Sequence, residues 1–493
     1  MNSVKTTKMT NYRWVICAML FLATAVNYMD RQVLSLTYPG EGGIQEEFGW
    51  TDENYGTITA YFSIVYAICM LFAGKFVDWM GTRKGYLWAI FVWSTGAVLH
   101  AFCGIATSGI VTGTWFVGFE GAKEVLSAFK TSGVADATLT ISTISVWLFL
   151  GARCVLALGE AGNFPAAIKV TAEYFPKKDR AYATAVFNSG ASVGALIAPF
   201  TIPVLAKFFG WEMAFVVIGA LGYIWMLFWI LLYKKPSKNS KVNGAELAYI
   251  NQDAIDTETS KETHDEGPSI GFLKCFTYKQ TWSFIVGKFM TDGVWWFFLF
   301  WTPAYLKSEF NINPTDVEGM VLIFVLYLIT MLSIFGGKLP TYFINKGMNP
   351  YAGRMRAMLI FAFFPLLGMF AQPLGGVFGT PWFPIILIGI LGAAHQSWSA
   401  NIFSTIGDMF PKSTIATITG IGGMAGGIGC FLINKGAGTL FTYAEGQGEA
   451  FAFMGFDGKP AGYMIIFCIC AVAYLIGWCI IKILVPKYKP VID

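Results

Sequence analysis

The sequence predicts an all-α membrane protein with twelve transmembrane helices in two six-helix bundles, and three observations lead to this prediction. Its 493 residues are 55% hydrophobic and only 13% charged, whereas soluble domains carry roughly 25% charged residues. Apolar runs recur along the chain at about the 20 residues that a bilayer-spanning helix needs. Six such runs precede a charged stretch and six follow it, as in membrane proteins built from two related halves.

The apolar runs give the expected spans in order. The first six lie at roughly 12–36, 55–77, 85–105, 142–172, 180–206 and 211–233. The second six lie at roughly 281–306, 317–343, 352–372, 380–410, 414–440 and 462–484. We therefore expect an N-terminal bundle (1–233), a cytoplasmic linker (234–279) and a C-terminal bundle (280–493). The run at 12–36 is span-length and carries charges, so it does not resemble a cleavable signal peptide.

Lysine and arginine are concentrated in the two termini, the linker and alternate loops, and the first loop on the other side has none. The positive-inside rule then places both termini in the cytoplasm, and we expect a bacterial inner membrane. The net charge of +4 reflects this excess of basic residues on the cytoplasmic side, and we do not interpret it as a nucleic-acid-binding surface. Two outer loops are long: 106–141, with an amphipathic stretch at 115–129, and 441–461, for which we expect an interfacial helix and a surface cap.

Four ionisable residues lie inside the predicted spans: Asp30 and Arg31 in the first, and Arg153 and Glu160 in the fourth. Each costs roughly 2.5–3.5 kcal/mol on insertion scales, so such residues usually line a polar cavity. Arg153 and Glu160 are seven residues apart and return to nearly the same helix face. The planar guanidinium of Arg31 suits a carboxylate, so the group predicts an anion and proton site. A static ion-pair network is the alternative.

The seventh span adds a second group of candidates. Lys288 and Asp292 are spaced i,i+4 and are expected to pair, with Lys288 as a possible substrate contact. Trp295 and Trp296 are candidates for stacking on the apolar face of a sugar ring. For Trp301 the expected role is an aromatic belt at the membrane interface.

In the tenth span, Trp398, Asn401 and Thr405 share one helix face. The amides of Gln396 and Asn401 are suited to hydrogen bonds with substrate hydroxyls, with interhelical bonding as the alternative. His395 is interpreted as a satisfied core histidine.

Several motifs resemble the major facilitator superfamily and, within it, the anion:cation symporter branch, which includes hexuronate, galactonate and other organic-anion transporters. The loop Gly74 to Lys84 resembles the signature loop of the superfamily, with Trp79 in place of the usual arginine. The branch resemblance is carried by Asn27-Tyr28-Met29-Asp30-Arg31, by Gly151 to Pro165, by Phe187-Asn188-Ser189-Gly190 and by His395-Gln396-Ser397-Trp398. The stretch Trp211-Glu212-Met213-Ala214-Phe215 looks particularly like the hexuronate transporters.

The resemblance implies roles for individual residues. Asp30 and Glu160, with Arg153 beside them, would carry the coupling proton. Arg31 would bind the substrate together with residues that match pocket positions of relatives, namely Tyr28, Tyr66, Asn188, Ser189, Ser397 and Trp398. The signature loop would act as a conformational latch through Gly74, Asp78, Gly81 and Arg83.

The resulting hypothesis is proton-coupled symport of a sugar-acid anion, a hexuronate such as glucuronate or galacturonate, by alternating access. The expected partners are a small carboxylate, protons and membrane lipids, with no cofactor, metal or nucleic acid, and the expected state is a monomer. Transport of another organic anion, such as galactonate or a phosphate ester, remains an alternative, as does a non-transporting nutrient sensor. An enzyme is not expected, because we find no convincing nucleophile–base pair or cofactor motif.

Overall fold

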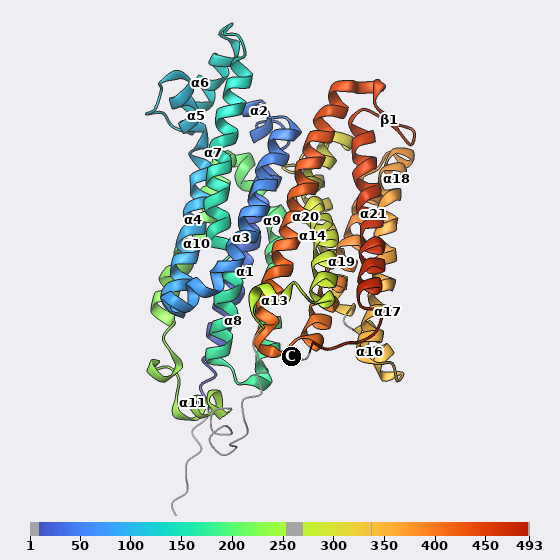
Figure 1. Ribbon diagram of the computed structural model, residues 1–493. Coiled ribbons are helices and arrows are strands. Elements are labelled where there is room, and N and C mark those ends of the chain that lie inside the picture. The colour runs from blue at the N-terminus through green and yellow to red at the C-terminus, as the bar shows by residue number, and fades with distance from the viewer. Residues whose placement is uncertain (1–8, 253–269, 337, 492–493) are drawn as a thin grey trace, which may run out of the picture.

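The computed structural model describes residues 9–252, 270–336 and 338–491, and Figure 1 shows two helical bundles standing side by side. The N-terminal bundle contains α1 (Arg13–Thr37), α3 (Asp52–Met80), α4 (Thr82–Ala101), α7 (Ala137–Glu160), α9 (Lys177–Phe209) and α10 (Trp211–Leu232). The C-terminal bundle contains α14 (Lys279–Phe310), α15 (Val317–Thr330), α17 (Pro350–Phe363), α19 (Trp382–Met409), α20 (Lys412–Gln447) and α21 (Lys459–Leu484). Each of the twelve predicted apolar runs is thus helical.

Shorter elements extend or connect these helices. They are α2 (Ile44–Phe48), α5 (Cys103–Thr112), α6 (Phe119–Thr131), α8 (Asn163–Tyr174), η1 (Pro236–Lys238), α11 (Gly244–Ile250), α13 (Phe272–Cys275), η2 (Met331–Phe335), α16 (Lys338–Asn345), η3 (Phe364–Phe370), α18 (Ala371–Phe378) and η4 (Gly448–Ala450). In Figure 1, α11, α16 and the C-terminus lie at one end of the bundles, here called the terminal end. The opposite end, with α2, α6 and β1, is called the distal end.

The helices differ in how well they satisfy a bilayer. Nine helices among the described residues are long and apolar enough to cross a membrane, or ten if the bent pair Thr82–Ala101 and Cys103–Thr112 is one span. The two predicted spans outside this set are α1 and α14. These helices carry Asp30 and Arg31, and Lys288 and Asp292, within their sequences. Both helices outside this set therefore carry charged residues of the predicted site.

Two long loops differ from the sequence expectation. The predicted cap at 441–461 begins as helix, because α20 continues to Gln447, and it ends in a hairpin of β1 (Ala452–Phe453) and β2 (Phe456–Asp457). The two strands are antiparallel, with Ala452 opposite Asp457 and Phe453 opposite Phe456. The amphipathic helix α6 begins at Phe119, four residues after the predicted start at 115, and buries Ala122 and Leu126.

The bundles meet closely along α3 and α20. A Cβ atom added to Gly56 of α3 would lie 2.9 Å from the Cα of Gly438 of α20, closer than real Cβ atoms approach. Glycine at these positions lets the two backbones approach directly, as small residues do between membrane helices.

Polar contacts tie the bundles together at the distal end, and we call the side chains of Asp52, Glu53, Lys435 and Lys459 the distal tie. The Asp52 carboxylate is 2% exposed. It lies 2.5 Å from Nζ of Lys459 and accepts a 3.1 Å hydrogen bond from the Tyr38 hydroxyl. Glu53 lies 2.9 Å from Nζ of Lys435. Because both pairs join the start of α3 to the C-terminal bundle, they hold the distal ends in contact.

Removing the buried half of the distal tie is expected to favour separation of the distal ends. Asp52→Asn would leave Lys459 without its nearest anion, and we expect the population with separated ends to rise about tenfold, the effect of roughly 1.4 kcal/mol. Spin labels at Thr138→Cys of α7 and Ser308→Cys of α14, in a background without the natural cysteines, would report the distance by double electron–electron resonance. The exposed Asp457→Asn is the control, and an unchanged distance distribution in Asp52→Asn would contradict the role of the tie.

A buried carboxyl at the distal end should make stability depend on pH. Burial raises the pKa of Glu47 to about 7, although its carboxylate accepts a hydrogen bond from Nε1 of Trp211 at 2.6 Å. The folded protein therefore binds a proton there that the unfolded chain releases at lower pH. This stabilisation is present at low pH and is lost as the pH rises through about 7. We expect the unfolding temperature to fall by roughly 2–4 °C between pH 5.5 and 8 in a thermal scan. Glu47→Gln should flatten this fall, whereas the exposed Glu41→Gln should not.

Candidate functional site

Arg31 lies in the centre of the candidate site and joins two helices of the N-terminal bundle. Its side chain projects from α1, and the residue is only 4% exposed. The guanidinium Nε donates a 2.8 Å hydrogen bond to Oε2 of Glu160, at the end of α7. The predicted ionisable residues of the first and fourth spans are therefore in direct contact. An ion pair this deeply buried leaves each charge dependent on the other.

Aromatic rings from both bundles, here called the aromatic box, surround the Arg31 guanidinium. Its Cζ atom lies 5.1 Å from the ring of Tyr28, 4.7 Å from that of Tyr66 and 5.5 Å from that of Trp296. Rings at such distances stabilise a cation through their negative faces. Tyr28 and Trp296 are only partly buried. Because Trp296 belongs to α14, the Arg31 site is shared between the two bundles.

The Arg31–Glu160 pair leaves hydrogen-bonding capacity unused. Among the described residues, Nη2 of Arg31 and Oε1 of Glu160 are buried and have no hydrogen-bond partner. Buried polar groups normally find a partner, so such groups mark a place where a ligand or a proton fits. Arg31 therefore holds Glu160 through Nε, while its Nη2 keeps the capacity to donate to a further acceptor.

Arg153 is hydrogen-bonded to the backbone of α1 beside the Arg31–Glu160 pair. Its Nη2 donates a 3.0 Å hydrogen bond to the carbonyl oxygen of Arg31, and its Cζ lies 4.6 Å from the ring of Phe62. Its Nε and Nη1 are buried and have no hydrogen-bond partner among the described residues. This hydrogen bond fixes the backbone of α1 at the Arg31 position.

Asp30 is turned away from Arg31, as the angle of about 100° between successive helix residues predicts. It is 1% exposed, and neither carboxylate oxygen has a hydrogen-bond partner within the described ranges. An ionised carboxylate in such surroundings is very costly, so the protonated form suits this place. The neighbouring Asn27 side chain is also buried without a hydrogen-bond partner there.

The C-terminal bundle contributes a second ion pair from α14. Nζ of Lys288 lies 2.7 Å from Oδ2 of Asp292, as the i,i+4 spacing predicts, and the two side chains are 8% and 16% exposed. Nζ of Lys288 also lies 4.6 Å from the ring centre of Phe403 in α19. Lys288 is thus neutralised within its own helix.

Other candidates in the C-terminal bundle pack against protein. The ring of Trp295 stacks on that of His395 at 5.6 Å, and Nδ1 of His395 is 2.7 Å from the Tyr474 hydroxyl. Trp398 is fully buried against Tyr474. The side chains of Ser397 and Asn401 donate hydrogen bonds to carbonyl oxygens of their own helix, whereas Gln396 is partly exposed. Of these residues, Gln396 is the one with surface left for a ligand.

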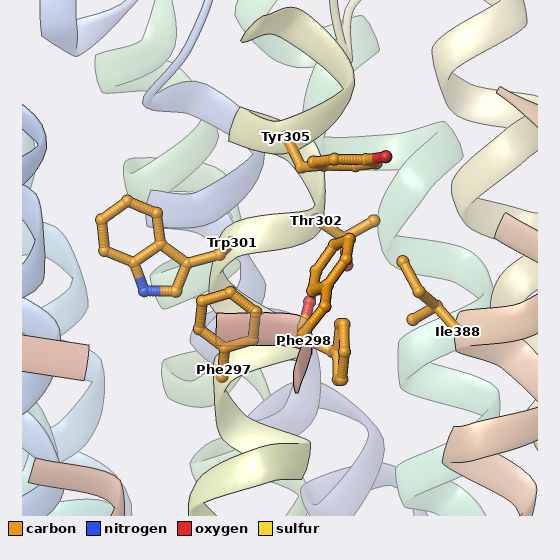
Figure 2. A pocket seen from close by; sticks show the side chains of 7 residues that line it. Phe297, Phe298, Trp301, Thr302, Tyr305 and Ile388 are labelled. Atoms are coloured by element: carbon orange, nitrogen blue, oxygen red, sulfur yellow. Dashed lines mark hydrogen bonds between the residues drawn. The ribbon is translucent and has the colours of Figure 1, made fainter. Parts of the chain in front are cut away.

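Trp301 corrects one sequence interpretation, because it lies in the protein interior and not in a belt at the membrane interface. It is 1% exposed, and its Nε1 donates a 3.0 Å hydrogen bond to Oδ1 of Asn434. Figure 2 shows it beside Phe297, Phe298 and Tyr305 on one segment of α14. The side chains that line the pocket at this position are Phe297, Phe298, Trp301, Thr302, Tyr305, Ile388 and Phe467. Five of these seven side chains are aromatic, and all seven belong to helices of the C-terminal bundle.

Among the described residues, the remaining candidates make no hydrogen bond, ion pair or ring contact with the Arg31 cluster. The side chains of Asn188 and Ser189 are exposed, and the Ser189 hydroxyl bonds the Val186 carbonyl of its own helix. In the signature loop, Gly81 takes a positive φ of 76°, and Nη2 of Arg83 donates a 2.7 Å bond to the Ile230 carbonyl. The Asp78 side chain, also predicted for the latch with Gly74, lies outside the described residues.

The structure adds residues that the sequence did not select. Phe62 faces Arg153, and Tyr474 holds His395, but no spacing signal in the sequence marks either residue. Asp292 was visible through its i,i+4 spacing from Lys288. Within the described ranges, no group of three or more His, Cys, Asp or Glu side chains is arranged to hold a metal ion.

Two helical bundles that share a buried charged site define an integral membrane protein of the transporter class. The chain matches the family model of the Major Facilitator Superfamily over residues 20–433, and it belongs to that family. It is 26% identical over 487 residues to a hexuronate transporter of Escherichia coli strain K12, covering 99% of this chain and 96% of the relative. It is 24% identical over 341 residues to a galacturonate transporter of Dickeya chrysanthemi, covering 68% and 84%.

Among solved structures, the fold is similar to a bacterial homolog of the human lysosomal transporter Spinster in an inward-facing and occupied conformation. The TM-score is 0.65 at 18% identity, over 97% of both chains. The sequence prediction of the family and of the fold is therefore confirmed.

Proposed function

We propose that this protein is a secondary active transporter that carries a sugar-acid anion, a hexuronate such as glucuronate or galacturonate, together with a proton. The observation that carries the proposal is the shared Arg31: Nε holds Glu160 at 2.8 Å, while the buried Nη2 has no hydrogen-bond partner among the described residues. The names of the relatives support the substrate class. We further propose a monomer in a bacterial inner membrane with both termini in the cytoplasm.

Substrate binding begins at the free edge of Arg31. A guanidinium offers donors in a planar fork, so a second carboxylate can bind beside Glu160 without displacing it at once. The rings of Tyr28 and Trp296 lie about 5 Å from the guanidinium and present apolar faces to a sugar ring. The amide of Gln396 is the candidate for a hydrogen bond to a substrate hydroxyl, because this residue remains partly exposed.

Proton coupling follows from sharing one cation between two carboxylates. When substrate binds Arg31, Glu160 loses part of its compensation, and its charged form becomes more costly in a buried place. Glu160 then takes a proton on its unbonded Oε1, with Asp30 as the second acid of the pathway. Substrate and proton thus stabilise the same occupied state, which is the condition for coupled transport by rocking of the two bundles.

Uptake by the purified protein in proteoliposomes tests this function. Radiolabelled glucuronate or galacturonate should accumulate when the outside is acidic, and the accumulation should collapse on addition of a proton uncoupler. Accumulation that survives the uncoupler would favour an exchanger of another anion. Vesicles that take up neither acid, although the protein is folded, would contradict the proposed substrate class.

A further inference from the structure

The C-terminal bundle brings its own charge pair to the Arg31 site along one face of α14. Lys288, Asp292 and Trp296 follow at intervals of four residues and therefore share a face of the helix. Trp296 lies 5.5 Å from the Arg31 guanidinium. Asp292 is one helical turn away from Trp296, about 6 Å along the axis, and Lys288 is one turn further. The face of α14 that closes the aromatic box around Arg31 thus continues directly into the Lys288–Asp292 pair.

The Asp292 side chain is held by an ion pair and fills a space left by a glycine. It is held by Lys288 at 2.7 Å, and its side chain keeps 16% exposure. A Cβ atom added to Gly426 of α20 would run into the Asp292 carboxylate, so the glycine leaves the room that this side chain fills.

Titratable residues on four other helices lie near the Lys288–Asp292 pair. Tyr28 of α1, Cys430 of α20 and Tyr474 of α21 are close enough to interact electrostatically with Asp292, and His395 of α19 with Lys288. Of these neighbours, Tyr28 also lies against Arg31, so Asp292 is within electrostatic reach of the substrate position.

The charges of the described site nearly cancel. Its cations are Arg31, Arg153 and Lys288, and its acids are Asp30, Glu160 and Asp292. If all six are ionised, the net charge is zero. Asp30 suits the protonated form, and Glu160 binds a proton in the occupied state proposed above, so the net charge depends on these two acids. In each of these states Asp292 makes the site one charge less positive, which disfavours the second carboxylate of a dianion at low dielectric.

We propose that Asp292 is a specificity-determining residue, which neutralises Lys288 and so restricts the site to sugar acids with a single carboxylate. This inference rests on the proposed function, because it assumes a sugar acid bound at Arg31. Without Asp292 the ammonium of Lys288 would be a free cation about two helical turns from Trp296, placed for the second carboxylate of a hexarate.

Competition between two acids that differ in charge tests the proposal. Galacturonate has one carboxylate, and galactarate has a second one at the other end of the same carbon chain. Inhibition constants of both would be measured against labelled galacturonate in proteoliposomes. In Asp292→Asn we expect the preference for galactarate over galacturonate to rise about tenfold or more relative to the wild type, because one negative charge near the bound dianion has been removed.

The double variant Lys288→Gln/Asp292→Asn is the matched control, because it restores the wild-type net charge while it removes the ion pair. Its preference should return to within about twofold of the wild type. Lys288→Gln alone, with the opposite change in charge, should weaken binding of both acids and of galactarate more. Glu309→Gln removes an acid from the same helix about 26 Å away and should leave the preference unchanged.

The outcomes separate the two proposals. A wild-type protein that binds neither acid overturns the proposed function and this inference together. A wild-type protein that transports galacturonate, with a preference that Asp292→Asn does not move, overturns the role of Asp292 alone. An equal shift in the single and double variants also overturns it, because the pair would then act through structure and not through charge. If Asp292→Asn does not fold, Lys288→Gln is the test. A preference between galactarate and galacturonate that does not change in this variant overturns the role of Asp292.

Discussion

Replacing Arg31 by lysine is expected to reduce galacturonate uptake at least 100-fold, although the positive charge is retained. Lysine has a compact ammonium group without the planar fork, so it cannot hold Glu160 with one edge and a carboxylate with another. It also loses the stacking on Tyr28, Tyr66 and Trp296 that positions the guanidinium. Loss of two charge-assisted hydrogen bonds, each worth roughly 1.5–3 kcal/mol, accounts for a change of this size.

Initial rates and galacturonate-dependent thermal stabilisation of the purified variant would measure this effect. The same substitution at Arg356, an exposed residue of α17, is the control and should leave uptake unchanged. If Arg31→Lys folds and takes up galacturonate at a rate within threefold of the wild type, then Arg31 is not the carboxylate-binding residue.

Replacing Glu160 by glutamine is expected to abolish accumulation driven by a proton gradient and to leave exchange of internal for external substrate. The glutamine oxygen can still accept the hydrogen bond from Nε of Arg31, so the local packing is preserved. The side chain can no longer bind and release a proton, so the occupied state forms without one. The proton gradient then no longer drives the transport cycle.

The two activities would be measured in the same proteoliposomes, first with an inward proton gradient and then with unlabelled substrate inside and no gradient. Glu124→Gln, at an exposed position of α6, provides a carboxylate-to-amide control that should keep both activities. Uphill accumulation by Glu160→Gln at the wild-type level would refute its assignment as the coupling acid. Loss of exchange as well as accumulation would point to a role in binding or packing instead.

Local sequence determined the helical segments and the two-bundle fold of this protein. Span-length apolar runs predict helices without reference to the rest of the chain, because a lipid-exposed backbone must satisfy its own hydrogen bonds. The same argument finds the charges in α1, since an ionised residue in an apolar run is costly wherever the helix packs. The i,i+4 spacing likewise gave the Lys288–Asp292 pair, which needs only one helix.

Only the tertiary structure decided which groups meet and which are turned away. Arg31 and Glu160 are 129 residues apart in sequence, and their contact depends on how α1 packs against α7. The aromatic box needs Trp296 from the other bundle, and the interior place of Trp301 depends on Asn434 of α20. Ser397 and Asn401 each donate a hydrogen bond to a carbonyl oxygen of their own helix, which spacing alone did not predict, because a side-chain donor bonds to a carbonyl one turn away when packing favours it. Periodicity assigns a side chain to a face, whereas the packing of distant segments decides what that face meets.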